Sequence, residues 1–314
     1  METQKKTLAA FVPHALIVLQ SVIYGFGDPI SKVAYESVPV FTLLTVRYLI
    51  AFLFLMLLFG KRVVREIKTV PIKALLPPCL CIAGTYLIGN VALVLTAATS
   101  VAFLRSLSTV ITPLLAFFVY RQKFPKKLLP IYLFVVIGLY LLCGLGGLSR
   151  FGLGEICALG AATLAAGTLL FGEHSLNSVS AATLTTVQAA ASTLLALVCA
   201  LLFDGGITLS GISPLAWGII LYLAITCTAL GYLLQNIAMC SISSRTVALL
   251  QCLCPVMTGV FSYFILNEHL TAAGLLGSGI ILGCVAAEIL LNQKRLFVHS
   301  CGSKMASSHT AARA

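Results

Sequence analysis

At residues 86–92 the chain reads Tyr86-Leu87-Ile88-Gly89-Asn90-Val91-Ala92, and at residues 232–238 it reads Tyr232-Leu233-Leu234-Gln235-Asn236-Ile237-Ala238. With the same offset of 146 residues (232 minus 86) and without a gap, Val101-Ala102-Phe103-Leu104 recurs as Val247-Ala248-Leu249-Leu250. Both copies lie in strongly apolar sequence, so the repeat predicts a duplicated set of membrane helices. In many secondary transporters, two such halves enclose a binding site near the middle of the bilayer.

The composition indicates that most of the surface faces lipid. Of the 314 residues, 60% are hydrophobic and 9% are charged, whereas a soluble domain carries about 25% charged residues. The net charge of +11 does not predict nucleic-acid binding, because the basic residues lie in short loops between apolar runs and form no basic face. The first apolar run lacks a small-residue cleavage site, so we interpret it as a retained helix and not as a signal peptide.

No motif predicts an enzyme or a cofactor. The chain has no glycine-rich phosphate loop, which argues against a built-in ATPase, and no His/Glu pair at metal-ligand spacing. Most of the 11 cysteines lie inside apolar segments, where they act as small hydrophobic residues. We therefore predict no catalytic residue, no metal and no cofactor.

The apolar runs give the number of helices. A helix that crosses the hydrocarbon core needs roughly 20 mostly apolar residues. Ten such runs lie at residues 12–34, 39–60, 74–97, 100–120, 128–147, 153–173, 181–203, 214–238, 244–266 and 271–291. The sequence thus predicts an all-α membrane protein of ten transmembrane helices, with one five-helix repeat at 1–150, a second at 151–292 and a polar cytoplasmic tail at 293–314.

The basic residues give the orientation, because Lys and Arg concentrate in cytoplasmic loops. A cytoplasmic N-terminus places most of them on that side: Lys5, Lys6, Lys61, Arg62, Arg65, Lys68, Lys73, Arg121, Lys123, Lys126, Lys127, Arg245, Lys294, Arg295, Lys304 and Arg313. We therefore expect both termini in the cytoplasm of a cell carrying this protein in its plasma or inner membrane. Because each half has an odd number of helices, the second half is inverted relative to the first.

Several segments resemble the EamA-type branch of the drug/metabolite transporter superfamily. The matching segments are Gly25 with Lys32 and Arg47, Thr228–Gln235, Val247–Leu250 with Pro255, Asn267–Thr271, and Gly274–Gly283. The chain departs from the family at Gln122, where the first repeat often has the glutamate matched by Glu268 in the second. The resemblance implies export or exchange of small metabolites such as amino acids, without ATP.

The segment Gly25–Pro29 suggests a broken first helix. Asp28 is suited to cap a second half-helix, with Pro29 at its first position, and a broken helix at membrane depth points to a binding site. Alternatively, Asp28 ends the helix near the outer interface or pairs with Lys32 four residues on. A buried carboxylate at Asp28 is also a candidate carrier of a coupling proton. We assign Asp28, Lys32 and Arg47 to coupling or gating.

Two arginines fall inside apolar runs, where a charge is costly unless it is paired or hydrated. Arg105 is a candidate to bind a substrate carboxylate, to which a guanidinium offers two parallel donors. The same role is open to Arg47. Alternatively, both snorkel to the surface or form structural ion pairs. The candidate partners are Asp28, Glu36 and Glu155. The second repeat has the neutral Gln251 at the position that matches Arg105.

Two polar pairs recur in the two halves. Tyr86 and Asn90 are four residues apart, as are Tyr232 and Asn236, so each pair shares a helix face. Together with Gln235 they are candidates for the convergent polar contacts of a small-molecule site. They are equally suited to hydrogen-bond between helices.

The leading hypothesis is a secondary transporter that moves a small metabolite across the lipid bilayer by alternating access. The alternative is a membrane receptor or scaffold with the same fold that transports nothing. The two hypotheses differ in whether a polar path runs between the halves. A homodimer is compatible with the sequence, which does not require one.

Overall fold

The computed structural model describes residues 2–96, 98–122, 128–141, 152–209, 212–267, 271–287 and 289–290, with the side chains of 2–10 and 99 left out. Across these residues the chain is helical and has no strand. The helices long and apolar enough to cross a membrane are Phe11–Ala34, Val40–Ile67, Ile72–Leu95, Ser100–Tyr120, Leu153–Ser175, Ala181–Phe203, Pro214–Met239 and Ser244–Leu266. Two shorter apolar helices, Leu129–Leu139 and Ala272–Ala287, complete the set. The predicted all-helical architecture of two five-helix repeats is confirmed.

The first repeat contains five helical spans, and one of these spans is interrupted and consists of two helices, α4 (Ala98–Ser106) and α5 (Ser108–Tyr120). The spans are α1 (Glu2–Ala34), α2 (Val40–Ile67), α3 (Ile72–Leu95), α4 with α5, and α6 (Leu129–Leu139). The second repeat follows the same order. It contains α8 (Leu153–Ser175), α9 (Ala181–Phe203), α10 (Pro214–Tyr222) with η3 (Leu223–Leu230) and α11 (Gly231–Met239), α12 (Ser244–Leu250) with α13 (Leu253–Leu266), and the helix Ala272–Ala287.

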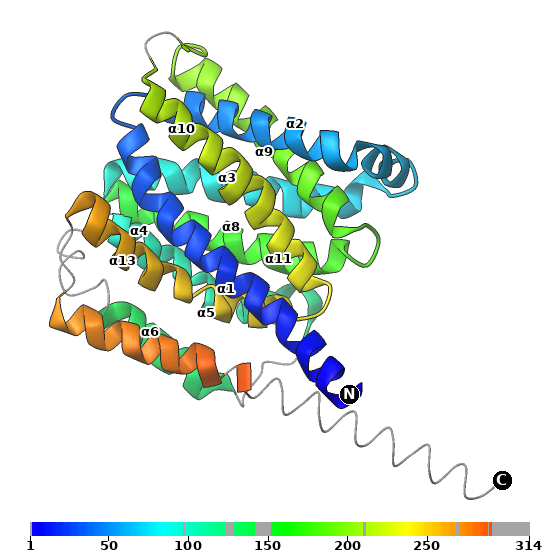
Figure 1. Cartoon of the computed structure of the whole chain (residues 1–314), viewed down its shortest axis with the longest axis vertical. Coiled ribbons are helices and arrows are strands. Elements are labelled where there is room, and N and C mark those ends of the chain that lie inside the picture. The colour runs from blue at the N-terminus through cyan, green and yellow to red at the C-terminus, as the bar shows by residue number, and fades with distance from the viewer. Residues whose placement is uncertain are drawn as a thin grey trace, which may run out of the picture.

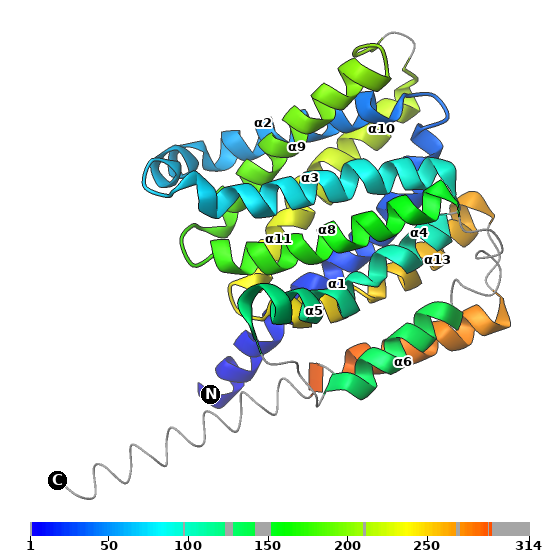
Figure 2. The ribbon, with the colours of Figure 1, turned by 180° about the vertical axis from the view of Figure 1, so that it is seen from behind.

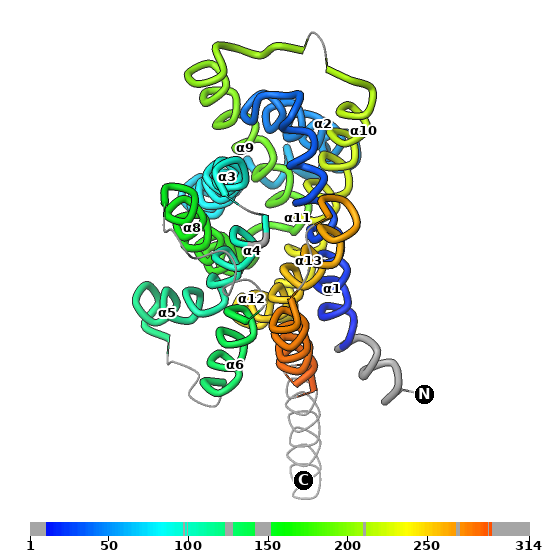
Figure 3. Tube along the Cα trace, turned by 90° about the vertical axis from the view of Figure 1, so that its left-hand side faces the viewer, coloured from blue at the N-terminus to red at the C-terminus, as the bar shows by residue number. Residues whose placement is uncertain are grey.

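The two repeats are interleaved. The most extensive helix pairings join opposite repeats: α3 packs along α8, α2 along α9, and α1 along α13 (Figures 1 and 2). Seen from the side, α3, α8 and α5 lie on one flank and α10, α1 and α13 on the other (Figure 3). The core therefore forms between the two halves.

Helix α6 and the helix Ala272–Ala287 lie side by side at one edge of the bundle (Figures 1 and 2), and side chains of both belong to the main hydrophobic core. They meet at Gly138, where a side-chain Cβ would lie 3.0 Å from the carbonyl oxygen of Gly277 and 3.0 Å from Cγ1 of Ile281. Glycine favours this close approach, because a side chain here would force its neighbours to shift by a few tenths of an ångström.

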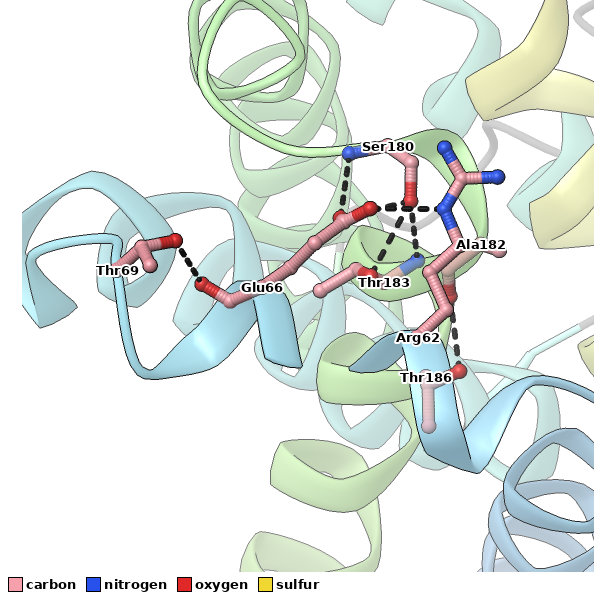
Figure 4. A network of polar contacts seen from close by, with 7 residues as sticks. All are labelled: Arg62, Glu66, Thr69, Ser180, Ala182, Thr183 and Thr186. Atoms are coloured by element: carbon pink, nitrogen blue, oxygen red, sulfur yellow. Dashed lines mark hydrogen bonds and ion pairs between the residues drawn. The ribbon is translucent and has the colours of Figure 1, made fainter. Parts of the chain in front are cut away.

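Helices α2 and α9 cap each other with carboxylates. Glu66, near the end of α2, accepts hydrogen bonds through Oε2 from the backbone N–H of Ser180 (3.0 Å) and from its hydroxyl (2.8 Å), at the start of α9 (Figure 4). Asp204, just after α9, accepts hydrogen bonds from the backbone N–H (2.7 Å) and hydroxyl (3.0 Å) of Thr42 in the first turn of α2. A helix N-terminus has unpaired N–H groups and a partial positive charge, so each carboxylate stabilises the opposite helix.

Helix α2 ends later than the apolar run predicts, at Ile67 and not near residue 60. The polar extension is stabilised by Arg62, whose Nε lies 2.7 Å from Glu66 Oε1 one turn further on. Hydropathy marks where the chain leaves lipid, whereas the helix continues as long as its last turns find partners.

The predicted break at Gly25–Pro29 is wrong, because α1 runs without interruption from Glu2 to Ala34 with Pro29 inside it. The glycine has another purpose: a Cβ on Gly25 would lie 2.9 Å from the backbone carbon of Met257 and 2.9 Å from the backbone nitrogen of Thr258 in α13. Gly25 thus permits close packing of α1 on α13. Asp28 lies within a continuous helix and does not cap a half-helix.

The interruptions occur instead in the fourth helix of each repeat. Between α4 and α5, the N–H of Leu107 bonds to the carbonyl of Leu104 (3.2 Å), three residues back. Between α12 and α13, the N–H of Cys252 bonds to the carbonyl of Leu249 (3.1 Å) in the same way. Such a short turn inside a longer helix often marks a hinge. Arg105 and Gln251, at matching repeat positions, stand at these two turns.

Candidate functional site

A cavity of about 730 Å³ lies between the two repeats. Polar side chains of both repeats line it: Ser21, Tyr24, Asp28, Thr85, Tyr86 and Arg105 from the first, and Thr168, Gln235 and Gln251 from the second. Both interrupted helices contribute to its wall, which is where discontinuous helices place binding sites in transporters.

A second, smaller cavity of about 280 Å³ adjoins the first. The two share four lining residues, Tyr24, Asp28, Tyr86 and Arg105. The smaller cavity alone is lined by Arg47 of α2 and Asn90 of α3, together with Leu223 and Cys227 of η3. The four shared residues therefore form the partition between two chambers.

The partition contains an ion pair. Nη1 of Arg105 lies 3.5 Å from Oδ1 of Asp28, and both side chains are about one-fifth exposed (19% and 18%). The guanidinium of Arg105 also lies over the ring of Tyr86, 5.7 Å from its centre. The pair links the interrupted fourth helix of the first repeat to α1. The predicted alternative in which Asp28 offsets an intramembrane arginine matches this geometry.

Arg47 has different surroundings, being 4% exposed. Its Nε donates a hydrogen bond to the hydroxyl of Thr228 (2.8 Å), and its guanidinium lies over the rings of Tyr48 (5.5 Å) and Tyr86 (5.7 Å). No carboxylate of the described residues lies within 4.0 Å of it. Arg47 is thus held by neutral groups alone within the part of the chain that the structure describes.

Thr228 belongs to the π-helical segment η3, a feature that the sequence did not reveal. The hydroxyl of Thr228 donates a hydrogen bond to the carbonyl of Leu223 (3.0 Å), five residues back, in addition to accepting the bond from Arg47. The wider π turn changes which side chains face the cavity, and such turns are common at functional sites. Helix propensity does not distinguish a π turn from an α turn, so no sequence signal marks it.

The ring of Tyr86, one of the partition residues, packs against two other tyrosine rings. The Tyr86 ring centre lies 5.5 Å from that of Tyr232 and 6.2 Å from that of Tyr48. Tyr232 is 1% exposed and is not among the residues that line either cavity. Of the two repeated tyrosines, Tyr86 therefore lines the cavities, whereas Tyr232 is buried against Tyr86 and lines neither.

The two repeated asparagines also differ. Asn90 lines the smaller cavity, where its Oδ1 accepts a hydrogen bond from the hydroxyl of Tyr35 (2.6 Å). Asn236 is fully buried, and its Nδ2 donates hydrogen bonds to Thr185 Oγ1 and Gln188 Oε1, each at 2.9 Å. Asn236 thus connects α11 to α9 away from the cavities. Lys32, half-buried near the end of α1, lines neither cavity.

A network of three glutamines lies at the edge of the larger cavity. Nε2 of Gln251 donates hydrogen bonds to Oε1 of Gln235 (2.8 Å) and Oε1 of Gln20 (3.0 Å), and Nε2 of Gln20 donates to Gln235 Oε1 (3.0 Å). The network joins α1, α11 and the turn between α12 and α13. Sequence reasoning missed Gln20, although Gln20, Tyr24 and Asp28 recur every four residues on one face of α1.

The arrangement is suited to recognition. Two guanidinium groups, one carboxylate, several hydroxyls and several amides converge from both repeats, at the junction of two cavities in an apolar bundle. These are the few convergent polar groups that fix a small molecule in a site. Among the described residues, no cluster of His, Cys, Asp and Glu could hold a metal ion.

Comparison with known proteins agrees with this geometry. A protein of Archaeoglobus fulgidus, described as an uncharacterized transporter, is 29% identical over 143 residues, which are 46% of this chain and 43% of that protein. The match thus spans less than half of that relative. A solved structure, titled only as the crystal structure of a protein, has a TM-score of 0.73 at 17% identity and covers 90% of this chain and 98% of its own, a likeness of fold.

The family profile matches twice. Residues 12–144 and residues 152–287 each match the EamA-like transporter family. The boundary between the two matches falls between α6 and α8, where the first five helices end and the second five begin. With a profile match on each half of a helical bundle that encloses a polar cavity, the chain belongs to the EamA-like transporter family.

Proposed function

We propose that this membrane protein is a secondary transporter that exports small metabolites such as amino acids by alternating access. The observation that carries the proposal is the polar cavity between the two repeats, lined by both and bordered by the interrupted helices α4–α5 and α12–α13. Alternating access requires one repeat to move against the other around a fixed site. A cavity shared by two halves is where such a site lies.

The hinge-like turns support the proposed motion. Arg105 and Gln251 stand beside the two turns, and each is tied to α1, through Asp28 and Gln20 respectively. In contrast, α2 and α9 are joined by carboxylate caps at both ends. In this proposal α2 and α9 form a rigid support while α1, α4–α5 and α12–α13 change their contacts.

Purified protein in liposomes tests the function. Vesicles are loaded with a panel of labelled amino acids, organic acids and neutral metabolites, and efflux is measured with and without a pH gradient. We expect the counterflow of at least one compound to be faster in vesicles that contain the protein than in vesicles without it. An impermeant thiol reagent then inhibits only the protein molecules inserted in one orientation, so the remaining flux gives the direction of transport. Export predicts faster flux from the face with the N-terminus.

The receptor or scaffold function is the alternative outcome. It predicts that a compound binds and raises the apparent thermal stability by mass action, yet is not moved in counterflow under any gradient. Binding and flux are therefore measured on the same preparation. Stabilisation without flux across the whole panel would reject the transporter proposal and favour the receptor.

A further inference from the structure

We propose that Arg47 is the anion subsite of the cavity and that the transported molecule carries a carboxylate bound by this guanidinium. The inference rests on the proposed function and names the substrate class of the same site. It begins from an imbalance of buried charge. Arg47 is 4% exposed, and no carboxylate of a described residue lies within 4.0 Å of it.

The carboxylates whose side chains are described are placed elsewhere. Asp28 pairs with Arg105, Glu66 with Arg62, Glu155 accepts from Thr96, Glu173 from the N–H of Ser244, and Asp204 from Thr42, while Glu36 is exposed. The smaller cavity is therefore lined by two guanidinium groups, Arg47 and Arg105, against one carboxylate, Asp28. Its ionisable side chains leave one positive charge uncompensated.

A buried charge without a partner is strongly unfavourable, because desolvation is not offset by an opposite charge. The rings of Tyr48 and Tyr86 offset part of this cost through cation–π contacts. An anionic group entering the smaller cavity would offset the rest. An anion should therefore bind to this site with a more favourable free energy than a neutral molecule of the same shape.

The orientation of Arg47 matches a carboxylate. The bond to Thr228 engages Nε (2.8 Å), and no hydrogen bond to a described residue engages the two terminal nitrogens Nη1 and Nη2. Arg47 lines the smaller cavity, so this end is available there. A guanidinium that offers two parallel N–H groups is geometrically suited to the two oxygens of a carboxylate.

Arg105 is less suited to the same task. Its partner Asp28 lies 3.5 Å away, so its charge is already compensated and an incoming anion would compete with an aspartate. Asn90 adds an amide to the lining of the smaller cavity. In this proposal the carboxylate end binds beside Arg47 in the smaller cavity, and the rest of the molecule extends past the partition into the larger cavity.

The test compares carboxylates with their amides. Purified full-length protein in detergent is titrated with L-leucine and L-leucinamide, and with isovalerate and isovaleramide, and the midpoint of thermal unfolding is followed. At least one carboxylate should raise the midpoint, and its amide should bind about tenfold or more weakly, as expected for loss of a charged hydrogen-bonded contact. Equal effects of acid and amide in both pairs would overturn the proposal, as would no effect of either acid.

Variants of Arg47 identify the residue. Arg47→Gln should remove the preference for the carboxylate over the amide, whereas Arg47→Lys should retain part of it. The matched control is Arg65→Gln, at an exposed arginine outside both cavities, which should bind like the wild type. A carboxylate preference unchanged in Arg47→Gln would overturn the assignment. If Arg47→Gln does not fold, the acid–amide comparison on wild-type protein and on Arg47→Lys still decides.

A separate arm distinguishes inorganic anions. Sodium chloride and inorganic phosphate are titrated alone and in competition with the acid. Stabilisation by these ions without stabilisation by any carboxylate would overturn the proposal of an organic substrate. The proposed function fails independently: acid-selective binding without flux refutes transport and leaves the subsite, whereas flux of a compound with no dependence on its carboxylate refutes the subsite and leaves transport.

Discussion

Nη1 of Arg105 lies 3.5 Å from Oδ1 of Asp28, and the two residues are 77 positions apart in the chain. The pair stands in the partition between two cavities and ties α1 to the turn that interrupts the fourth helix. Any rearrangement of that turn relative to α1 must lengthen or break this contact. The two charges thus connect the site to the proposed motion.

Replacing Asp28 by asparagine should destabilise the protein. The substitution keeps the shape of the side chain but leaves the Arg105 charge uncompensated in a mostly buried position. Because both side chains are about one-fifth exposed, we expect a loss of about 1–3 kcal/mol, below the cost of breaking a fully buried pair. Thermal unfolding in detergent measures the loss. The double variant Asp28→Asn with Arg105→Gln should recover part of it.

A different result is expected if Asp28 carries a coupling proton. Asp28→Asn would then unfold like the wild type, and counterflow in liposomes would no longer respond to a pH gradient. The two outcomes are distinguished by measuring stability and flux on one preparation. Wild-type behaviour in both assays would show that neither the pair nor proton exchange at Asp28 matters.

Gly25 should tolerate no side chain. A Cβ at this position would lie 2.9 Å from two backbone atoms of α13, at Met257 and Thr258, so α1 and α13 would have to separate. We expect Gly25→Ala to lower stability by about 1–3 kcal/mol. Gly218→Ala is the matched control, because no atom lies within 4 Å of the added Cβ and alanine favours a helix by up to about 1 kcal/mol. Equal effects of both substitutions would show that α1 and α13 are not packed this closely.

Loss of a helix cap should be measurable at Asp204. Its carboxylate accepts two hydrogen bonds from Thr42 at the start of α2. Asp204→Ala should cost about 0.5–2 kcal/mol, the range for removal of a capping side chain. Glu36→Ala, at an exposed carboxylate between the end of α1 and the start of α2, is the control and should be nearly neutral. Thermal unfolding of both variants at low and high salt should show a smaller difference at high salt, because salt screens the contribution of the helix dipole.

The fold could largely be predicted from the sequence because the bilayer sets the length of an apolar helix. Where the ends of the ten apolar runs lie among the described residues, most match the observed helix ends to within a few residues. The end of α2 differs, since Arg62 and Glu66 extend the helix through contacts that hydropathy does not register. The break expected at Gly25–Pro29 is absent. The sequence did not reveal this, because a glycine–proline segment is compatible both with a break and with a close helix contact. Only the facing helix, α13, decides between the two.

The candidate site was predicted less completely. Spacing indicates which residues share a face, so Tyr86, Asn90 and Gln235 were found, and charge in an apolar run revealed Asp28, Arg47 and Arg105. Spacing does not indicate whether that helix face contacts a cavity or another helix. Tyr232, Asn236 and Lys32 were therefore grouped with the others, although they line neither cavity. Their roles in binding or gating stay predictions.

The orientation in the membrane is predicted from the positive loops and can be tested by labelling single cysteines in a cysteine-free background. Arg65→Cys, near the end of α2, should resist an impermeant thiol reagent in intact cells, and Thr208→Cys, in the loop after α9, should react. Both positions are exposed, so a difference in labelling reports the side of the membrane. Thr208 is preferred to the neighbouring Gly206, whose φ of 117° a cysteine would adopt only with strain.

Permeabilised cells supply the control, because both cysteines should then react to a similar extent. Labelling of Arg65→Cys and protection of Thr208→Cys in intact cells would place the N-terminus outside. That result would invert the proposed topology and contradict the positive-inside argument. It would also reverse the direction assigned to transport, because the same cavity would then face the opposite compartment in each state.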